Sequence, residues 1–253
     1  MKKQEAATVI NITRIKAACK DCSLHELCLP MGLGEPDLVA LDQAIKRRRT
    51  LKKGELLYRF GDPLKSLYAL RSGSMKTTGL IEDGRVQITG FYLPGELLGI
   101  DAINADVHPC SAEALEASDV CEIPYPALED LALKIPGLQH QLLRIMSREI
   151  VRDEEMLMML GRMTAEEKLA SCLMSFSRRL TGPGNGAVDF KLSMSRQDLG
   201  DYLGLALETV SRLLSRFQED GLITVHGRHI LLHDVPRLRA MATGGRSEHS
   251  VRA

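Results

Sequence analysis

The sequence lacks any run of about 18 apolar residues, which is the shortest stretch expected of a transmembrane helix. It also lacks the polar composition of a disordered chain, because 44% of its 253 residues are hydrophobic and 26% are charged. Net charge is absent as well: Lys and Arg total 33, and so do Asp and Glu. Taken alone, a net charge of zero argues against binding to nucleic acid.

The charge is, however, distributed unevenly. Residues 1–30 carry a net charge of +2, residues 31–162 carry −4, and residues 163–253 carry +2. An acidic central region therefore lies between two mildly basic ends, and the C-terminal end remains a candidate for binding DNA.

Cysteine is scarce too, and six residues are too few for a disulfide scaffold in a chain of this length. Asn11, Arg14 and Lys16 interrupt the N-terminal stretch, so it has no apolar region of the kind found in signal peptides. We therefore expect an uncleaved, cytoplasmic protein without a membrane partner. Thiols in that compartment stay reduced, and a cluster of them favours metal binding or redox chemistry.

Three of the cysteines, Cys19, Cys22 and Cys28, lie within ten residues of one another. Three soft thiolates suit zinc or an iron–sulfur cluster, and either needs a fourth ligand. Cys121 is one candidate for the fourth ligand, and because it lies shortly before a long helix, a ligand there could couple the state of the metal group to that helix. The competing candidates are Cys110, Cys172 and His25. The spacing alone does not distinguish zinc from iron and sulfide.

Glycines punctuate short alternating runs between residues 50 and 125, and Asp83-Gly84 is a hairpin signal. This pattern predicts a small antiparallel sandwich or barrel. A helical stretch without internal Gly or Pro then begins at Pro136-Gly137 and extends to Gly161.

Apolar residues recur along this helix at steps of three and four, which is typical of a coiled-coil interface between two copies of the chain. We call these positions the seam: Leu143, Met146, Ile150, Leu157 and Leu160. The alternative is an amphipathic helix that packs on its own domain. Asp153 occupies the seam position between Ile150 and Leu157, where two copies would place carboxylates against each other. The sequence therefore predicts a marginal dimer that can act as a switch, unless rotation of the helix brings Asp153 to solvent.

The C-terminal region has the pattern of a helix-turn-helix followed by a two-stranded wing. Ser195 is an expected N-cap with Asp198 three residues later, and Gly204 is expected to end this first helix. The second helix follows Ala206, which stands where a Ser or Thr would cap it. The expected strands of the wing are residues 222–225 and 229–232.

The second helix is the candidate reader of DNA bases. Glu208 can accept from cytosine, Arg212 can donate to guanine, and Ser211 can contact thymine or phosphate. We expect Leu207, Val210, Leu213 and Leu214 to face the core. The candidate phosphate contacts are Arg196, Arg216 and Arg228. A solvated pair of Glu208 and Arg212 is the alternative, which the agreement of turn, cap and wing disfavours.

Taken together, these motifs resemble the FNR/ANR branch of the CRP/FNR family of bacterial transcription regulators. The resemblance rests on the cysteine segment 19–30, on Val120-Cys121-Glu122-Ile123-Pro124, and on residues 202–212. It implies an α+β chain with an N-terminal β-roll (double-stranded β-helix or jelly-roll) sensor domain, a long dimerisation helix and a C-terminal winged helix-turn-helix.

The resemblance also implies domain ranges. These are a cluster-binding segment over 1–30, the β-roll over 31–135, the dimerisation helix over 136–162, the winged helix-turn-helix over 163–245 and a tail over 246–253. It further implies an oxygen-labile [4Fe–4S] cluster on Cys19, Cys22, Cys28 and Cys121, one per monomer, and an Asp153 that opposes dimerisation without the cluster. The implied partners are an inverted repeat resembling TTGAT-N4-ATCAA and RNA polymerase.

One departure from the wider family concerns its cyclic-nucleotide binders, which hold the ligand phosphate with an Arg-Ser pair. Here Gly95-Glu96 is present, but the later position reads Cys110-Ser111. Without the arginine a phosphodiester has no bidentate partner, so we expect no binding of cyclic nucleotides and a structural role for Cys110. The alternatives to an oxygen-sensing regulator are a zinc-stabilised regulator and a thiol redox sensor. No nucleophile–base constellation indicates an enzyme.

Overall fold

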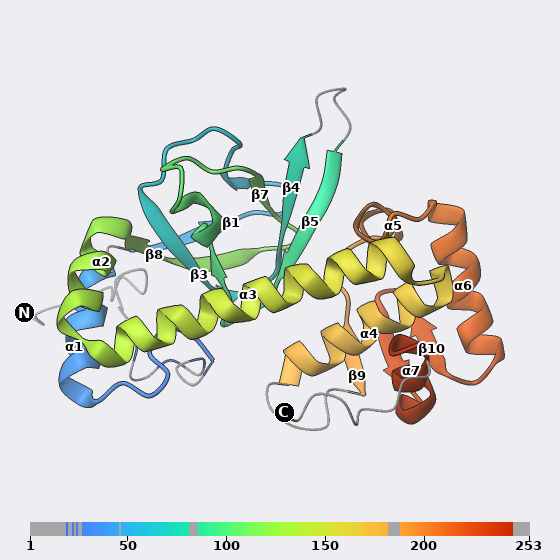
Figure 1. The fold of residues 1–253 in the computed structure, drawn as a ribbon. Coiled ribbons are helices and arrows are strands. Elements are labelled where there is room, and N and C mark those ends of the chain that lie inside the picture. Colours follow the sequence, from blue (N-terminus) through green and yellow to red (C-terminus); the bar gives the residue numbers. More distant parts are fainter. Residues whose placement is uncertain are drawn as a thin grey trace, which may run out of the picture.

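The structure is a computed structural model that describes residues 19, 22, 24, 27–45, 47–80, 86–181 and 188–244. A long helix runs across the molecule, past a β-rich domain, and leads to a smaller helical domain (Figure 1). None of the helices in the described ranges is long and apolar enough to cross a membrane.

The β-rich domain consists of two four-stranded antiparallel sheets. One has the order β1-β8-β3-β6, made of Arg47–Leu51, Ser118–Pro124, Ser66–Ser72 and Leu97–Leu98. The other has the order β2-β7-β4-β5, made of Leu56–Tyr58, Ser111–Ala114, Met75–Leu80 and Val86–Tyr92. Apart from the hairpin formed by β4 and β5, neighbouring strands in each sheet are not consecutive in sequence, which is the topology of a β-roll. The antiparallel architecture predicted from the glycine-rich runs is therefore confirmed.

Alternating side chains of the two sheets fill the space between them. The buried cluster includes Leu51, Leu70, Met75, Leu98 and Val120, each at most 1% exposed. Strands β4 and β5 pair along their whole length from Met75↔Tyr92 to Leu80↔Val86. They are the two strands of the hairpin expected at Asp83-Gly84. These two residues themselves lie outside the described ranges.

Helices α1 (Glu35–Ala44) and α2 (Tyr125–Lys134) cover one end of the β-roll beside the start of α3 (Pro136–Arg162), as Figure 1 shows. The 3-10 helix η3 (Ile100–Ala102) follows β6. One face of α3 is buried through Leu138, Gln141, Ile145 and Met159. The long helix therefore has an inner face that packs on its own chain and an outer face that does not.

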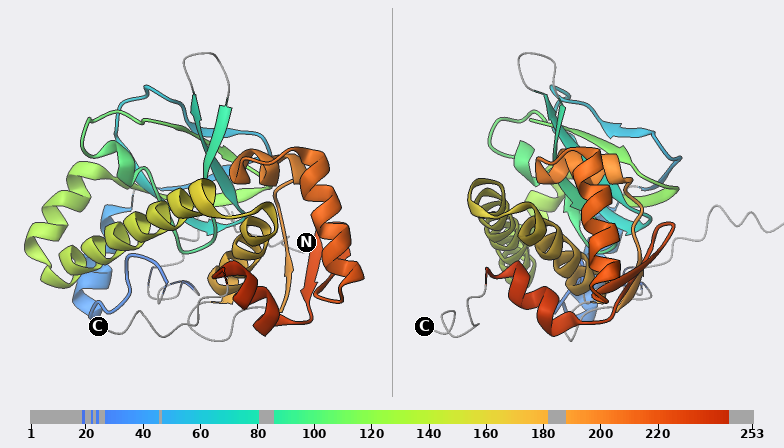
Figure 2. Two further views of the ribbon diagram at one scale, coloured as in Figure 1. Left: turned by 45° about the vertical axis from the view of Figure 1, so that its right-hand side comes forward. Right: turned by 90° about the vertical axis from the view of Figure 1, so that its right-hand side faces the viewer.

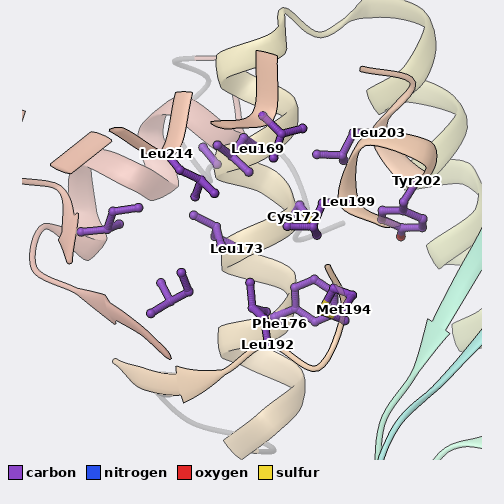
Figure 3. Packing of buried hydrophobic residues seen from close by; sticks show 14 of the residues in the cluster. Leu169, Cys172, Leu173, Phe176, Leu192, Met194, Leu199, Tyr202, Leu203 and Leu214 are labelled. Carbon is purple, nitrogen blue, oxygen red and sulfur yellow. The ribbon is translucent and has the colours of Figure 1, made fainter. Parts of the chain in front are cut away.

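The C-terminal domain contains α4 (Ala165–Thr181), α5 (Arg196–Leu203), α6 (Leu207–Glu219) and α7 (Val235–Ala242). Its sheet has the order β10-β11-β9, made of Ile223–His226, His229–Leu232 and Asp189–Lys191. Figure 2 shows α5 and α6 at the end of the molecule away from α1 and α2. Side chains from α4, α5 and α6, including Leu169, Phe176, Leu199 and Leu214, converge on one core (Figure 3).

Local sequence explains how the two helices of this domain begin and end. Ser195 accepts from the Asp198 backbone N–H at 3.0 Å, and Asp198 accepts from the Ser195 backbone N–H at 2.8 Å. This reciprocal capping box satisfies two otherwise unpaired donors. Gly204 ends α5 with φ of 64°, a conformation that glycine adopts without strain. Ala206 makes no side-chain cap at the start of α6.

Candidate functional site

The four cysteines predicted as ligands line one pocket. Cys19, Cys22 and Cys28 come from the N-terminal segment, and Cys121 comes from β8. The remaining walls are mainly apolar and include Leu29, Leu41, Ile45, Ala69 and Ile123. Side chains separated by about a hundred residues in sequence are thus brought to a single concave site between the N-terminal segment and the sheet.

Burial dominates the chemistry of these thiols. It raises the pKa of Cys19 to about 12, with smaller contributions from the Asp42 carboxylate and the Cys121 thiol. Burial also raises the pKa of Cys28 to about 12. For Cys121, burial raises the pKa although Arg48 opposes it. Thiolates in this pocket therefore need a positively charged centre to compensate for their desolvation.

The donor set fits a metal group that prefers sulfur. Four thiols share an apolar pocket, and no disulfide joins the cysteines in the described ranges. Among the described residues, no three ligating side chains are placed so as to hold a single metal ion. His25, the other candidate ligand near these cysteines, lies outside the described residues. Cys110 and Cys172 are buried in separate clusters, inside the β-roll and inside the C-terminal domain respectively.

The N-terminal segment that lines the pocket is in contact with α3. Gln141 is only 2% exposed, and its Nε2 donates to the backbone oxygen of Cys28 at 3.3 Å. Leu29 belongs to the same buried cluster as Leu138 and Ile145. A change in how the N-terminal segment packs therefore acts directly on the first half of the long helix.

The seam residues form a stripe of exposed apolar side chains on α3. Leu143 is 59% exposed, Ile150 58% and Leu157 71%, while Met146 and Leu160 are 38% and 37% exposed. Asp153 lies on the same helix and is exposed in the single chain. Partial desolvation raises its pKa above the ordinary value, with Arg152 opposing the shift and Asp101 adding to it. The apolar seam is therefore exposed on the outer face of α3 in the single chain.

The predicted base-reading side chains lie on the exposed side of α6. Glu208 and Arg212 are exposed and Ser211 is half-buried, whereas Val210, Leu213 and Leu214 are buried. The expectation that Leu207 faces the core is wrong, because its side chain is 38% exposed. Leu207 is the first residue of α6, and the buried side of the helix begins only at Val210, which is 0% exposed.

The predicted phosphate contacts have different surroundings. Arg196 is exposed at the first position of α5. Arg216 forms an ion pair with Glu166 of α4, and its side chain is 59% exposed. An exposed pair of this kind contributes little, about 0–1 kcal/mol, so Arg216 stays available to phosphate. In the wing, Arg228 donates to the Ser193 backbone oxygen at 2.6 Å.

The Gly95-Glu96 position holds a contact that sequence reasoning missed. Glu96 accepts from Arg179 Nε at 2.8 Å and from Arg152 Nη2 at 3.0 Å. Burial raises the pKa of Glu96, but the two guanidinium groups outweigh burial, so that its pKa lies below the ordinary value. Arg152 belongs to α3 and Arg179 to α4, so this carboxylate joins the β-roll to both helices. Its partners lie 56 and 83 residues away, beyond the range of any local pattern.

The position of the missing arginine is occupied by a small hydrogen-bonded cluster. Cys110 is 5% exposed, and its thiol donates to Asp101 Oδ2 at 3.2 Å. His108 stacks on Tyr58 with ring centroids 3.7 Å apart. These contacts agree with a structural thiol in place of a phosphate-binding side chain.

A β-roll sensor domain joined through a long helix to a winged helix-turn-helix defines a class of transcription regulators. Comparison with known families agrees: residues 48–134 match the cyclic nucleotide-binding domain and residues 167–241 match the Crp-like helix-turn-helix domain. The chain is 50% identical over 229 residues to the transcriptional activator protein Anr of Pseudomonas protegens, covering 90% of this chain and 94% of the relative.

Two further relatives agree. The chain is 47% identical over 224 residues to the fumarate and nitrate reduction regulatory protein of Salmonella typhimurium, covering 88% of this chain and 90% of the relative. The solved structure of FixK2 from Bradyrhizobium japonicum is 34% identical, with a TM-score of 0.71, and covers 77% of this chain and 96% of that one. The chain belongs to the CRP/FNR family and is a regulator of the FNR/ANR type, not an enzyme.

Proposed function

We propose that this regulator senses oxygen through one [4Fe–4S] cluster per monomer, held by Cys19, Cys22, Cys28 and Cys121. The observation that carries the proposal is the shared apolar pocket of these four thiols, whose N-terminal segment contacts the long helix. When bound, such a cluster supplies an oxygen-labile link between the N-terminal segment and β8. The names of the relatives, an activator called Anr and a fumarate and nitrate reduction regulator, support this interpretation.

The chain's own residues convert this link into an effect on dimerisation. Gln141 and Leu29 connect the N-terminal segment to the buried face of α3, so the segment stabilises one position of that helix. In this position the apolar seam of one copy packs on that of another and outweighs the repulsion between the two Asp153 carboxylates. Without the link the repulsion prevails and the dimer weakens.

The dimer then presents two α6 helices to successive major grooves about 34 Å apart. Glu208, Ser211 and Arg212 contact bases of an inverted repeat resembling TTGAT-N4-ATCAA, while Arg196 and Arg216 contact phosphates. We further propose five regions: the cluster-binding segment over 1–30, the β-roll over 31–135, the dimerisation helix over 136–162, the winged helix-turn-helix over 163–245 and a tail over 246–253. The protein acts in the cytoplasm and contacts RNA polymerase. It does not respond to cyclic nucleotides.

Purification without oxygen tests the cofactor. We expect a brown protein with about four iron and four sulfide per monomer, which air bleaches while the dimer dissociates. Stoichiometric zinc with unchanged dimerisation in air would show a zinc-stabilised regulator instead. Reversible disulfides among Cys19, Cys22 and Cys28, without iron, would show a thiol redox sensor.

Substitution of single cysteines tests the ligand set. Cys121→Ala removes a pocket thiol and should abolish assembly of the cluster, measured as iron content and visible absorbance. Cys110→Ala is the matched control, because this cysteine also belongs to the β-roll but is buried outside the pocket. Full iron content in the Cys121→Ala protein would show that another residue is the fourth ligand.

A further inference from the structure

The β-roll and the C-terminal domain share an interface with an apolar centre. Phe91 of β5 lies 4.8 Å from Tyr202 of α5 and 5.8 Å from Phe176 of α4, measured between ring centroids. Ile88 and Leu115 of the β-roll belong to the same buried cluster. The sensor domain therefore packs directly on the helices that carry the DNA-reading unit.

An ion pair crosses this interface beside the apolar centre. Lys76 Nζ of β4 lies 2.9 Å from Asp198 Oδ1 of α5, and the two side chains are only 17% and 16% exposed. Asp198 is also the residue whose carboxylate completes the capping box with Ser195. Burial raises the pKa of Asp198, but the hydrogen bonds from Ser195 and Lys76 lower it by more. The pKa therefore lies below the ordinary value, and this carboxylate stays charged. Lys76 therefore holds α5 at its first turn.

Two further contacts hold the same region. Gln87 of β5 donates to the backbone oxygen of Asp201 in α5. Glu116, in the turn between β7 and β8, accepts from the Ser193 hydroxyl just before α5 and lies 3.7 Å from Lys191 Nζ. Lys76, Gln87 and Glu116 of the β-roll thus make polar contacts with β9, with the segment that precedes α5 and with α5 itself.

The hydrophobic contacts at this interface are non-directional, whereas a charge-assisted hydrogen bond depends on the distance and angle between its two groups. Helices α5 and α6 are joined only by the tight turn at Gly204, so fixing α5 also fixes the reading helix α6. The β-roll is in turn fixed to α3 through Glu96 and Arg152. The contact at Lys76 is therefore one of the links that set the orientation of α6 relative to the long helix, and it is the one that acts at the first turn of α5.

We propose that Lys76 is a positioning residue for DNA recognition. Its ion pair with Asp198 sets the angle between α6 and α3, and so sets the half-site spacing that a dimer accepts. The proposal rests on the proposed function in that it requires a dimer on an inverted repeat. One extra base pair between the half-sites shifts one of them by about 3.4 Å and rotates it by about 34–36°, which a fixed pair of reading helices rejects and a loosened pair tolerates.

The test measures binding of the anaerobically purified protein to DNA with spacers of three, four and five base pairs. The variants are Lys76→Met, the conservative Lys76→Arg, and the double variant Lys76→Met with Asp198→Asn. The control is Lys53→Met, which removes an exposed lysine from the turn before β2. Asp198→Asn retains an oxygen that can cap α5, so the double variant removes the buried Asp198 carboxylate that Lys76→Met leaves without its lysine. Glu113 Oε2, the more exposed carboxylate 3.9 Å from Lys76 Nζ, is retained in all the variants.

Lys76→Met should lower the preference for the best spacer by about tenfold, within the range typical of coupling between two sites. Lys76→Arg should restore the preference, and Lys53→Met should leave it unchanged. The double variant should stay relaxed although its thermal stability recovers. Full spacer preference in the double variant would overturn the proposal, because the effect of Lys76→Met would then come from a destabilised α5. Failure of the wild-type protein to bind any inverted repeat would instead refute the proposed function.

Discussion

Replacement of Asp153 by alanine should convert the aerobic protein from a weak to a stable dimer. The seam exposes apolar side chains on both sides of this residue, with Ile150 at 58% and Leu157 at 71% exposure. In a symmetric parallel pair the two Asp153 carboxylates face each other. Two charges about 5 Å apart repel by about 3 kcal/mol at an effective dielectric constant of about 20.

This repulsion corresponds to more than about a hundredfold in the dimer dissociation constant. Sedimentation velocity of the aerobic protein over a range of concentrations measures it directly. Glu155→Ala is the matched control, because Glu155 is on the same helix but off the seam, in an exposed ion pair with Arg178. An Asp153→Ala protein that stays monomeric at the concentrations where wild type does would refute the assignment of the seam.

Dependence on pH gives an independent check of the same residue. Partial desolvation already raises the pKa of Asp153 in the monomer, with Arg152 opposing the shift and Asp101 adding to it. The facing carboxylate in a dimer raises this pKa further, so the protonated form favours the dimer. Dimerisation of wild type should therefore strengthen as the pH falls through the raised pKa and weaken above it. The Asp153→Ala protein should lose that part of the pH dependence.

Two further predictions concern the C-terminal domain. Arg212→Ala should lower discrimination at one base pair of the half-site by about 1–3 kcal/mol, measured by competition with single-base variants; an equal loss on all sequences would place Arg212 on phosphate. Phe176→Ala should destabilise the protein by about 3–5 kcal/mol, measured by urea unfolding, because its ring is 2% exposed between Phe91 and the C-terminal core. A loss below about 1 kcal/mol would mean that the interface does not contribute to folding.

Local patterns predicted the antiparallel sheets, the long helix and the helix-turn-helix, but not α2, α7 or the third strand β9 of the C-terminal sheet. Glycine-punctuated alternation predicted the antiparallel sheets, and the Ser195–Asp198 spacing predicted a capping box that the structure contains. These features depend on neighbours within a few residues, where backbone conformation and hydrogen bonding are decided locally. The same reasoning placed Leu207 in the core and was wrong, because helical periodicity does not show where the neighbouring elements stop.

The candidate site required more than local pattern. The spacing of Cys19, Cys22 and Cys28 indicated a shared ligand, but the fourth thiol came from weighing Cys121 against other cysteines and from the resemblance to a family. The structure brings Cys121 into the pocket because β8 lies between β1 and β3, beside the N-terminal segment. The choice of metal group stays a prediction that iron and sulfide analysis decides.

The sequence by itself determined the antiparallel sheets, the long helix with an acidic position in its apolar seam, and the helix-turn-helix, and it supplied the candidate side chains for metal and DNA. Only the tertiary structure decided how the domains are joined. The Glu96–Arg179 and Lys76–Asp198 contacts connect residues 83 and 122 positions apart. No local sequence pattern indicates such pairs. The strength of an ion pair depends on burial and distance, and both are set by the packing of the whole chain.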